Sequence, residues 1–246
     1  NLKIIKSLKK ISENSDVILL CINAQSMFDF LAENFNSFKN KPLVFCSKGI
    51  DTKYCLFQTE IAERFLDKKL FSVLSGPGFA SDIVREKPIA LSLACKNVNL
   101  GKKLQHMLSS QSIRIYLNND LIGTQLGGAL KNVIAIACGI ADANELGEGA
   151  KSAIITRGFS EIRQIGKTFG CKIETLFGLS CLGDLTLTCT SKLSRNYNFG
   201  LKIGNNIKNE KDKKETIEGE KTANAAFLIS KKYQLDLPII KTVNKL

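Results

Sequence analysis

The chain has 246 residues, of which 44% are apolar and 24% are charged. This balance is typical of a folded protein with a hydrophobic core, and it excludes an intrinsically disordered chain. The length exceeds the roughly 100–150 residues of a usual domain, so one large domain or two smaller ones are expected. The net charge of +12 suits an anionic partner, but much of it is lysine in polar stretches such as 208–214, where a solvated surface is the simpler explanation.

The first 119 residues alternate short apolar runs with longer polar stretches. Nearly continuous apolar runs predict five strands, at residues 16–22, 42–46, 71–74, 89–94 and 113–117. Helical spacing between them predicts helices at 26–38, 52–65 and 100–108. Runs that are apolar throughout are typical of strands that helices cover on both faces. This part is therefore expected to be an α/β layered domain.

The pattern changes after residue 119, where strand signals almost vanish. Helical spacing predicts helices at 121–141, 150–169, 194–207, 222–232 and 239–246. We therefore predict two domains, an α/β domain at 1–119 and an all-α domain at 120–246. Ligand sites favour such interfaces, so a site is expected in the cleft between the two domains.

The eight cysteines form no CxxC pair, and His106 is the only histidine. A zinc site or a disulfide framework needs closer spacing, so neither a metal site nor disulfides are expected. Most of the cysteines lie in apolar segments, which favours a reducing, cytoplasmic compartment. No apolar run approaches the roughly 18 residues that span a bilayer, so no membrane span is expected.

Lys131 is the only charged residue in the apolar helix predicted over residues 125–141. Burying an unpaired ammonium costs several kcal/mol, so a lysine is normally excluded from such a helix. Gly127 and Gly128 lie one turn earlier on the same face and leave space beside it, although each glycine weakens a helix by about 1 kcal/mol relative to alanine. From the helix alone, a catalytic lysine and a lysine that extends to solvent at the rim of the core are equally good explanations.

Several short motifs, in order along the chain, resemble those of the bacterial-type NAD(P)-dependent glycerol-3-phosphate dehydrogenases. They occupy residues 47–49, 75–80, 128–135, 183–189, 194–200 and 217–219. The resemblance runs from the first residues to the last. It implies a Rossmann-like α/β domain followed by an all-α substrate domain, and it allows a homodimer.

The same resemblance implies an oxidoreductase that interconverts sn-glycerol 3-phosphate and dihydroxyacetone phosphate by hydride transfer with NAD or NADP. Its product would supply phospholipid synthesis. The family's Gly-rich pyrophosphate loop is expected to precede Asn1, and its extreme C-terminus to follow Leu246, so the Rossmann-like domain is expected to be incomplete. The choice between NAD and NADP is left open.

By this resemblance Lys131 is the base that takes the hydroxyl proton as hydride leaves for the nicotinamide. Lys48 is a second cation that contacts substrate and cofactor, and Asp184 is a substrate-site carboxylate that balances the lysines. A lysine is a poor base near its free pKa of about 10.4, but burial and a second ammonium would lower that pKa. From the residues alone, Lys48 is better explained as a surface lysine and Asp184 as a turn residue.

Ser194, Arg195 and Asn196 open a predicted helix, where backbone N–H groups and an arginine favour a phosphate. The resemblance implies that this triplet binds glycerol phosphate and that Arg195 also touches the cofactor. Without the resemblance, Ser194 would be explained as a helix N-cap.

The resemblance implies further contacts in two loops. Gly76 and Gly78 would face the substrate, and Ala80, Thr216 and Glu218 would contact the cofactor. Gly78 departs from the family, which usually has serine or threonine there, so only its backbone could replace the lost hydroxyl. An exposed loop glutamate is the alternative explanation of Glu218.

Two other functions are alternatives to the dehydrogenase that the resemblance implies. A β-hydroxyacid dehydrogenase of the 6-phosphogluconate type also carries a helical lysine after a nucleotide domain, but it lacks the Gly-Asp-Leu and Ser-Arg-Asn motifs. A non-catalytic, basic nucleic-acid-binding remnant would explain the charge. Aromatic residues are only 7% of the chain and do not alternate with the basic runs, so specific nucleic-acid binding is not expected.

Overall fold

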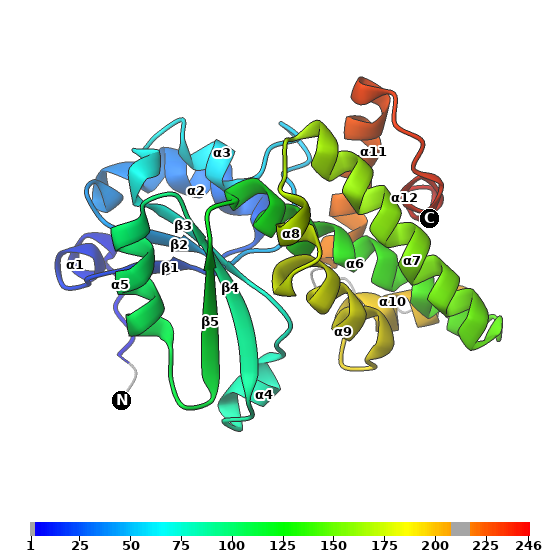
Figure 1. Ribbon diagram of the computed structural model, residues 1–246. Coiled ribbons are helices and arrows are strands. Elements are labelled where there is room, and N and C mark those ends of the chain that lie inside the picture. The colour runs from blue at the N-terminus through cyan, green and yellow to red at the C-terminus, as the bar shows by residue number, and fades with distance from the viewer. Residues whose placement is uncertain (1–2, 208–216) are drawn as a thin grey trace.

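The computed structural model describes residues 3–207 and 217–246, and it has an α/β part followed by a helical part (Figure 1). This order confirms the predicted fold class. The last strand ends at Asn118 and the next helix begins at Leu121. The domain boundary at residues 119 and 120 stays a prediction.

One sheet of five strands, in the order β1-β2-β3-β4-β5, forms the centre of the α/β part. The strands are β1 (Ile18–Leu20), β2 (Leu43–Phe45), β3 (Phe71–Ser75), β4 (Ile89–Cys95) and β5 (Ile113–Asn118). Each overlaps the apolar run that predicted it. Neighbouring strands pair in parallel except β3 and β4, which are antiparallel. Because β1 and β2 run in parallel, their carboxyl ends lie at the same edge of the sheet.

The chain reverses direction between β3 and β4 in the segment that contains Gly76. This residue has a φ of +152°, and a Cβ there would lie 3.1 Å from the Cα of Leu91. Only glycine meets both conditions without strain. Glycine at this position therefore allows the loop to pass close to β4.

Helices cover both faces of the sheet (Figure 1). One face carries Met27, Leu31 and Ile61 in its core cluster, and the opposite face carries Leu104. The helices of this part are α1 (Leu8–Glu13), α2 (Met27–Asn34), α3 (Gln58–Ala62), α4 (Ala80–Val84) and α5 (Val98–Leu108), with short 3-10 helices at Ala24–Ser26, Phe35–Phe38 and Lys68–Leu70.

The helical part is built around α6 (Leu121–Ala143), which α7, α9, α10, α11 and α12 surround. The other helices are α7 (Gly147–Thr168), α8 (Ile173–Leu176), α9 (Asp184–Thr190), α10 (Arg195–Gly204), α11 (Glu218–Tyr233) and α12 (Pro238–Val243), with a π-helical turn at Leu179–Gly183. The sequence predicted α6, α7, α10, α11 and α12. It did not predict the helical stretch from Ile173 to Thr190.

Helix α6 is long and apolar enough, by length and composition, to cross a membrane. However, 78% of its most apolar window is buried inside the protein. The central helix of a bundle has this composition because neighbouring helices cover it on all sides. Its apolar surface is therefore explained by packing.

Two glycines set how closely α6 and α10 cross. A Cβ on Gly139 would overlap the carbonyl oxygen of Tyr197, and a Cβ on Gly200 would overlap the carbonyl oxygen of Ile136. The two backbones are therefore in direct contact, and no larger residue fits at either position. This contact fixes α10 against the C-terminal half of α6.

We predict that Gly139→Ala destabilises the fold by about 1–3 kcal/mol, because overpacking forces the two helices apart. The matched control is Gly149→Ala on α7, where nothing lies within 4 Å of an added Cβ. That change should stabilise the helix by up to about 1 kcal/mol. Urea-unfolding midpoints of both variants test this, and shifts in the same direction would contradict the described crossing.

Candidate active site

A cavity of about 450 Å³ lies where the carboxyl ends of β1 and β2 meet the helical part. Its wall includes seven charged or amide side chains, which come from both parts of the chain: Asn23, Lys48, Lys131, Asn132, Arg195, Asn196 and Glu218. The remaining lining residues are Cys21, Ile22, Cys46, Ser47, Phe79, Thr188, Leu193 and Ser194. Ligands bind at this edge of parallel sheets because the strand ends and the following loops converge there.

The carboxylate of Asp184 joins two ammonium groups at one side of this cavity. Lys131 Nζ donates a hydrogen bond of 2.6 Å to Asp184 Oδ1, and Lys48 Nζ donates one of 2.6 Å to Asp184 Oδ2. The Asp184 side chain is 1% exposed, that of Lys131 is 9% exposed and that of Lys48 is 27% exposed. Two cations therefore share one buried anion, and the cluster keeps a positive charge.

The glycines before Lys131 allow this cluster to form. A Cβ on Gly127 would lie 2.6 Å from the Cα of Cys181, and a Cβ on Gly128 would lie 2.8 Å from Ser75 Oγ. Helix α6 therefore touches both the π-helical turn before Asp184 and the end of β3. As expected, the two glycines leave space beside Lys131, and Cys181 and Ser75 occupy that space.

The environment of Lys131 lowers the pKa of its side chain to about 8. Burial is the largest cause, because it penalises the charged form, and the nearby ammonium of Lys48 is the second. The charge and hydrogen bond of Asp184 act in the opposite direction. A substantial fraction of Lys131 is therefore a neutral amine in mildly alkaline solution.

Thr188 is a polar neighbour of Lys131 that the sequence analysis missed. Its Oγ1 accepts a hydrogen bond of 2.9 Å from Lys131 Nζ and donates one of 2.6 Å to the carbonyl oxygen of Asp184. It lies one helical turn after Asp184 on α9, a spacing that could have identified it. Asn132 was also missed, although it is a polar residue beside Lys131 in an otherwise apolar helix.

The start of α10 forms another part of the cavity wall. Ser194 caps the helix, since its Oγ accepts a hydrogen bond of 3.2 Å from Tyr197 N–H. Asn196 Oδ1 accepts one of 3.0 Å from Gly219 N–H and so connects α10 to the start of α11. Arg195 is exposed at the cavity. A guanidinium next to a helix N-terminus is a suitable site for an anion.

Glu218 lines the same cavity, and its Oε2 atom would lie 2.9 Å from a Cβ on Gly49, in the loop after β2. This Oε2 atom is buried and has no hydrogen-bond partner among the described residues. Burial raises the pKa of the Glu218 carboxyl, despite the opposing effects of the Ala24 N–H and the charge of Arg195. Unsatisfied buried polar atoms are costly, so the Oε2 atom of Glu218 is a candidate partner for a polar ligand in the cavity.

The residues predicted from the loop after β3 differ in whether they line the cavity. Gly76 contributes its carbonyl oxygen, which accepts a hydrogen bond of 3.2 Å from Lys48 Nζ. From this loop only Phe79 is among the cavity-lining residues, whereas Gly78 and Ala80 are not. The predicted roles of these residues stay predictions. Thr216 lies outside the described residues.

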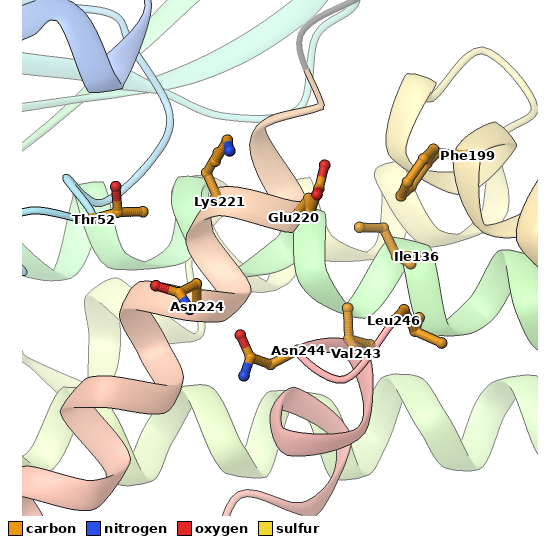
Figure 2. A pocket seen from close by; sticks show the side chains of 9 residues that line it. All are labelled: Thr52, Ile136, Phe199, Glu220, Lys221, Asn224, Val243, Asn244 and Leu246. Carbon is orange, nitrogen blue, oxygen red and sulfur yellow. The ribbon is translucent and has the colours of Figure 1, made fainter. Parts of the chain in front are cut away.

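A second cavity, of about 300 Å³, lies between α6, α11 and α12 (Figure 2). Glu220 and Lys221 on α11 border it on one side, and apolar residues such as Ile136 and Val243 border it on the other. It contains none of the residues predicted for the site. Within residues 3–207 and 217–246, no group of three or more histidine, cysteine or acidic side chains could hold a metal ion.

Comparison with known proteins finds one family along almost the whole chain. The family model for the NAD-dependent glycerol-3-phosphate dehydrogenase N-terminus matches residues 1–101, and the model for the C-terminus matches residues 120–246. A glycerol-3-phosphate dehydrogenase (NAD(P)+) of Roseobacter denitrificans is 43% identical over 231 residues, which are 94% of this chain and 72% of the relative. The enzyme of the same name from Zymomonas mobilis is 39% identical over 233 residues, covering 94% and 68%.

A solved structure shows the same similarity. The crystal structure of glycerol-3-phosphate dehydrogenase from Coxiella burnetii superposes with a TM-score of 0.91 at 32% sequence identity. The match covers 97% of this chain and 74% of that chain.

We predict that two substitutions move the pKa of Lys131 in opposite directions. Lys48→Met should raise it because a neighbouring positive charge is removed, and Asp184→Asn should lower it because the stabilising anion is removed. NMR titration of isotope-labelled lysine side chains measures both shifts. Lys151→Met is the control, because Lys151 pairs with Asp142 and Glu148 instead. Shifts of the same sign would show that the cluster is described wrongly.

Proposed function

Because the chain belongs to the NAD-dependent glycerol-3-phosphate dehydrogenase family, we propose that the Lys131–Asp184–Lys48 cluster is its catalytic centre. The enzyme interconverts sn-glycerol 3-phosphate and dihydroxyacetone phosphate with NAD(P). This reaction is consistent with a supply of glycerol phosphate for phospholipid synthesis. The family assignment favours this reaction over that of a β-hydroxyacid dehydrogenase.

The observation that carries the proposal is the lowered pKa of Lys131 beside a second ammonium. Oxidation of the alcohol requires a base for the hydroxyl proton, and a neutral Lys131 amine fills that role. In the reverse direction the Lys131 ammonium returns the proton to the ketone oxygen. An ammonium has three N–H donors, of which Asp184 and Thr188 use two, so one is left for the substrate oxygen.

Lys48 acts through its charge. Its ammonium stabilises the negative charge that develops on the substrate oxygen, and it lowers the pKa of Lys131. Asp184 holds both ammonium groups in fixed positions by separate oxygens. The reaction thus takes place beside a preorganised pair of cations, which need no rearrangement as charge develops.

The phosphate of the substrate is proposed to bind at the start of α10. Arg195 supplies a forked cationic donor, and the helix N-terminus of Ser194 and Asn196 supplies backbone N–H groups. A phosphate here would lie in the same cavity as Lys131. One small phosphorylated alcohol in this cavity could therefore contact both Arg195 and Lys131.

The cavity also fits a dinucleotide cofactor. The parallel strand ends of β1 and β2 border it, and the unsatisfied Oε2 atom of Glu218 is buried near it. When bound, NAD or NADP accepts the hydride from the alcohol carbon or returns it. Lys48, Arg195 and Glu218 are proposed to hold it, and the roles predicted for Ala80 and Thr216 are kept as part of this proposal.

We also propose a cytoplasmic location. All eight cysteines lie in the described part of the chain and are free thiols, which suits a reducing compartment. The predicted homodimer and the predicted lack of specific nucleic-acid binding stay predictions.

The variant Lys131→Met tests the base. Loss of a positioned base costs about 10²–10⁴-fold in rate, so kcat should fall by at least 100-fold while NADH affinity stays within a few fold. Stopped-flow kinetics and NADH fluorescence titration measure the two quantities. Lys151→Met, outside the cavity, should keep normal turnover. A Lys131→Met enzyme with more than a tenth of wild-type kcat would remove Lys131 from this role.

The variant Arg195→Ala tests the phosphate site. Loss of charge-assisted hydrogen bonds worth roughly 1.5–3 kcal/mol should raise KM for glycerol 3-phosphate by about 10–150-fold. The rate with unphosphorylated glycerol should change much less, since no phosphate contact is lost. Arg114→Ala on β5, away from the cavity, is the control. Equal effects on both substrates would mean that Arg195 does not bind the phosphate.

A further inference from the structure

Two cysteines face each other at the carboxyl ends of neighbouring parallel strands. Cys21 follows β1 directly and Cys46 follows β2 directly. The last paired residues of these strands are Leu20 and Phe45, and Cys46 N–H then donates a hydrogen bond of 3.0 Å to the carbonyl oxygen of Leu20. Pairing therefore continues past the strands and places Cys21 opposite Cys46.

This arrangement matches the geometry of a disulfide bond. Neighbouring strands lie about 4.7–4.9 Å apart, and a disulfide joins Cα atoms that are about 4.4–6.8 Å apart. Side chains opposite each other on neighbouring strands project from the same face of the sheet. Both thiols line the active-site cavity, and the Cys46 thiol donates a hydrogen bond of 3.7 Å to the carbonyl oxygen of Val44.

The two thiols differ in acidity. The interaction with the neighbouring Cys46 thiol lowers the pKa of Cys21 to about 6, and the same interaction raises the pKa of Cys46 well above its usual range. Cys21 is exposed, whereas Cys46 is half-buried. An accessible thiolate with a neighbouring thiol that can complete a disulfide is the usual arrangement of redox-sensitive cysteines.

The other cysteines lack this combination. Cys138 on α6 and Cys189 on α9 also form a thiol–thiol contact, but both are fully buried in the helical core, and burial raises the pKa of Cys189. Burial is also the largest cause of the raised pKa of the four remaining thiols, which are Cys55, Cys95, Cys171 and Cys181. The chain thus has one accessible cysteine pair and one inaccessible pair, and the two can be compared in the same sample.

We propose that Cys21 and Cys46 are a redox-sensitive pair, which hydrogen peroxide converts into a reversible disulfide in the wall of the active-site cavity, with loss of turnover. The loss of turnover rests on the proposed function. The disulfide itself does not, because it depends only on the positions and accessibility of the two thiols.

One molecule of hydrogen peroxide is enough to oxidise the two thiols to a disulfide. The Cys21 thiolate attacks one peroxide oxygen, the O–O bond breaks, and a sulfenic acid and a hydroxide ion form. The Cys46 thiol then attacks the Cys21 sulfur, the S–S bond forms, and the sulfenic oxygen leaves as water once protonated. The two thiols lose two electrons in total, and peroxide gains them to become two molecules of water.

The disulfide would disturb the site through the chain that follows it. An S–S bond is about 2.0 Å long, so the two sulfurs must move from non-bonded to bonded distance. Lys48 is only two residues after Cys46, and its Nζ is 2.6 Å from Asp184 Oδ2. Misplacement of a catalytic group by 1 Å can cost about 100-fold in rate, so we expect at least a tenfold fall in kcat.

The test is peroxide treatment of the protein, followed by blocking of free thiols, peptide mapping and assay of the same samples. We expect a Cys21–Cys46 crosslink, reduced Cys138 and Cys189, and recovery of kcat after dithiothreitol. Cys46→Ser should prevent both the crosslink and the dithiothreitol-reversible loss measured against its own untreated sample. Cys55→Ser, the control, should behave as wild type.

Two results would overturn the inference. One is a Cys21 that stays reduced, or that is oxidised without a link to Cys46. The other is a mapped Cys21–Cys46 disulfide with unchanged kcat, which would refute the loss of turnover. Absence of glycerol-3-phosphate turnover in the untreated, reduced protein would instead contradict the proposed function, and peptide mapping would still decide whether the disulfide forms.

Discussion

The buried carboxylate of Asp184 accepts hydrogen bonds from two ammonium groups that arrive from opposite sides. Lys48 comes from the end of β2 in the sheet, and Lys131 comes from the central helix α6. Buried charges are tolerated only when they are paired, and loss of one partner typically costs about 3–5 kcal/mol. The same interaction therefore connects the two parts of the protein, and together with burial and the charge of Lys48 it determines the pKa of the proposed base.

Close packing around α6 is the condition for this interaction. Gly127 and Gly128 let the helix approach the turn before Asp184 and the end of β3, and Gly139 lets α10 cross it in backbone contact. Each glycine weakens the isolated helix, but tertiary packing on all sides of α6 outweighs that loss. The crossing with α10 also fixes Arg195 relative to Lys131. The glycines thus position the proposed base and the proposed phosphate site on one rigid element.

The sequence predicted those features that depend on local patterns. Apolar runs located all five strands, and a lone lysine in an apolar helix identified Lys131 as unusual. The antiparallel pairing of β3 with β4 was not predictable, because apolar runs do not reveal the relative direction of neighbouring strands. Nor could periodicity reveal that Asp184, 53 residues away, pairs with Lys131, since only the fold brings them together. Thr188 was missed because its hydroxyl matters only through that pairing.

Lys131, with a pKa lowered to about 8, is the proposed base of the reaction. The most direct measurement is the pH dependence of kcat for oxidation of glycerol 3-phosphate, with substrate deuterated at C2 to establish that hydride transfer limits the rate. A base must be neutral to accept a proton, so the rate should rise with pH and level off above an apparent pKa near 8. A rate that is independent of pH in this range, or that still rises toward the free lysine value of about 10.4, would contradict the claim.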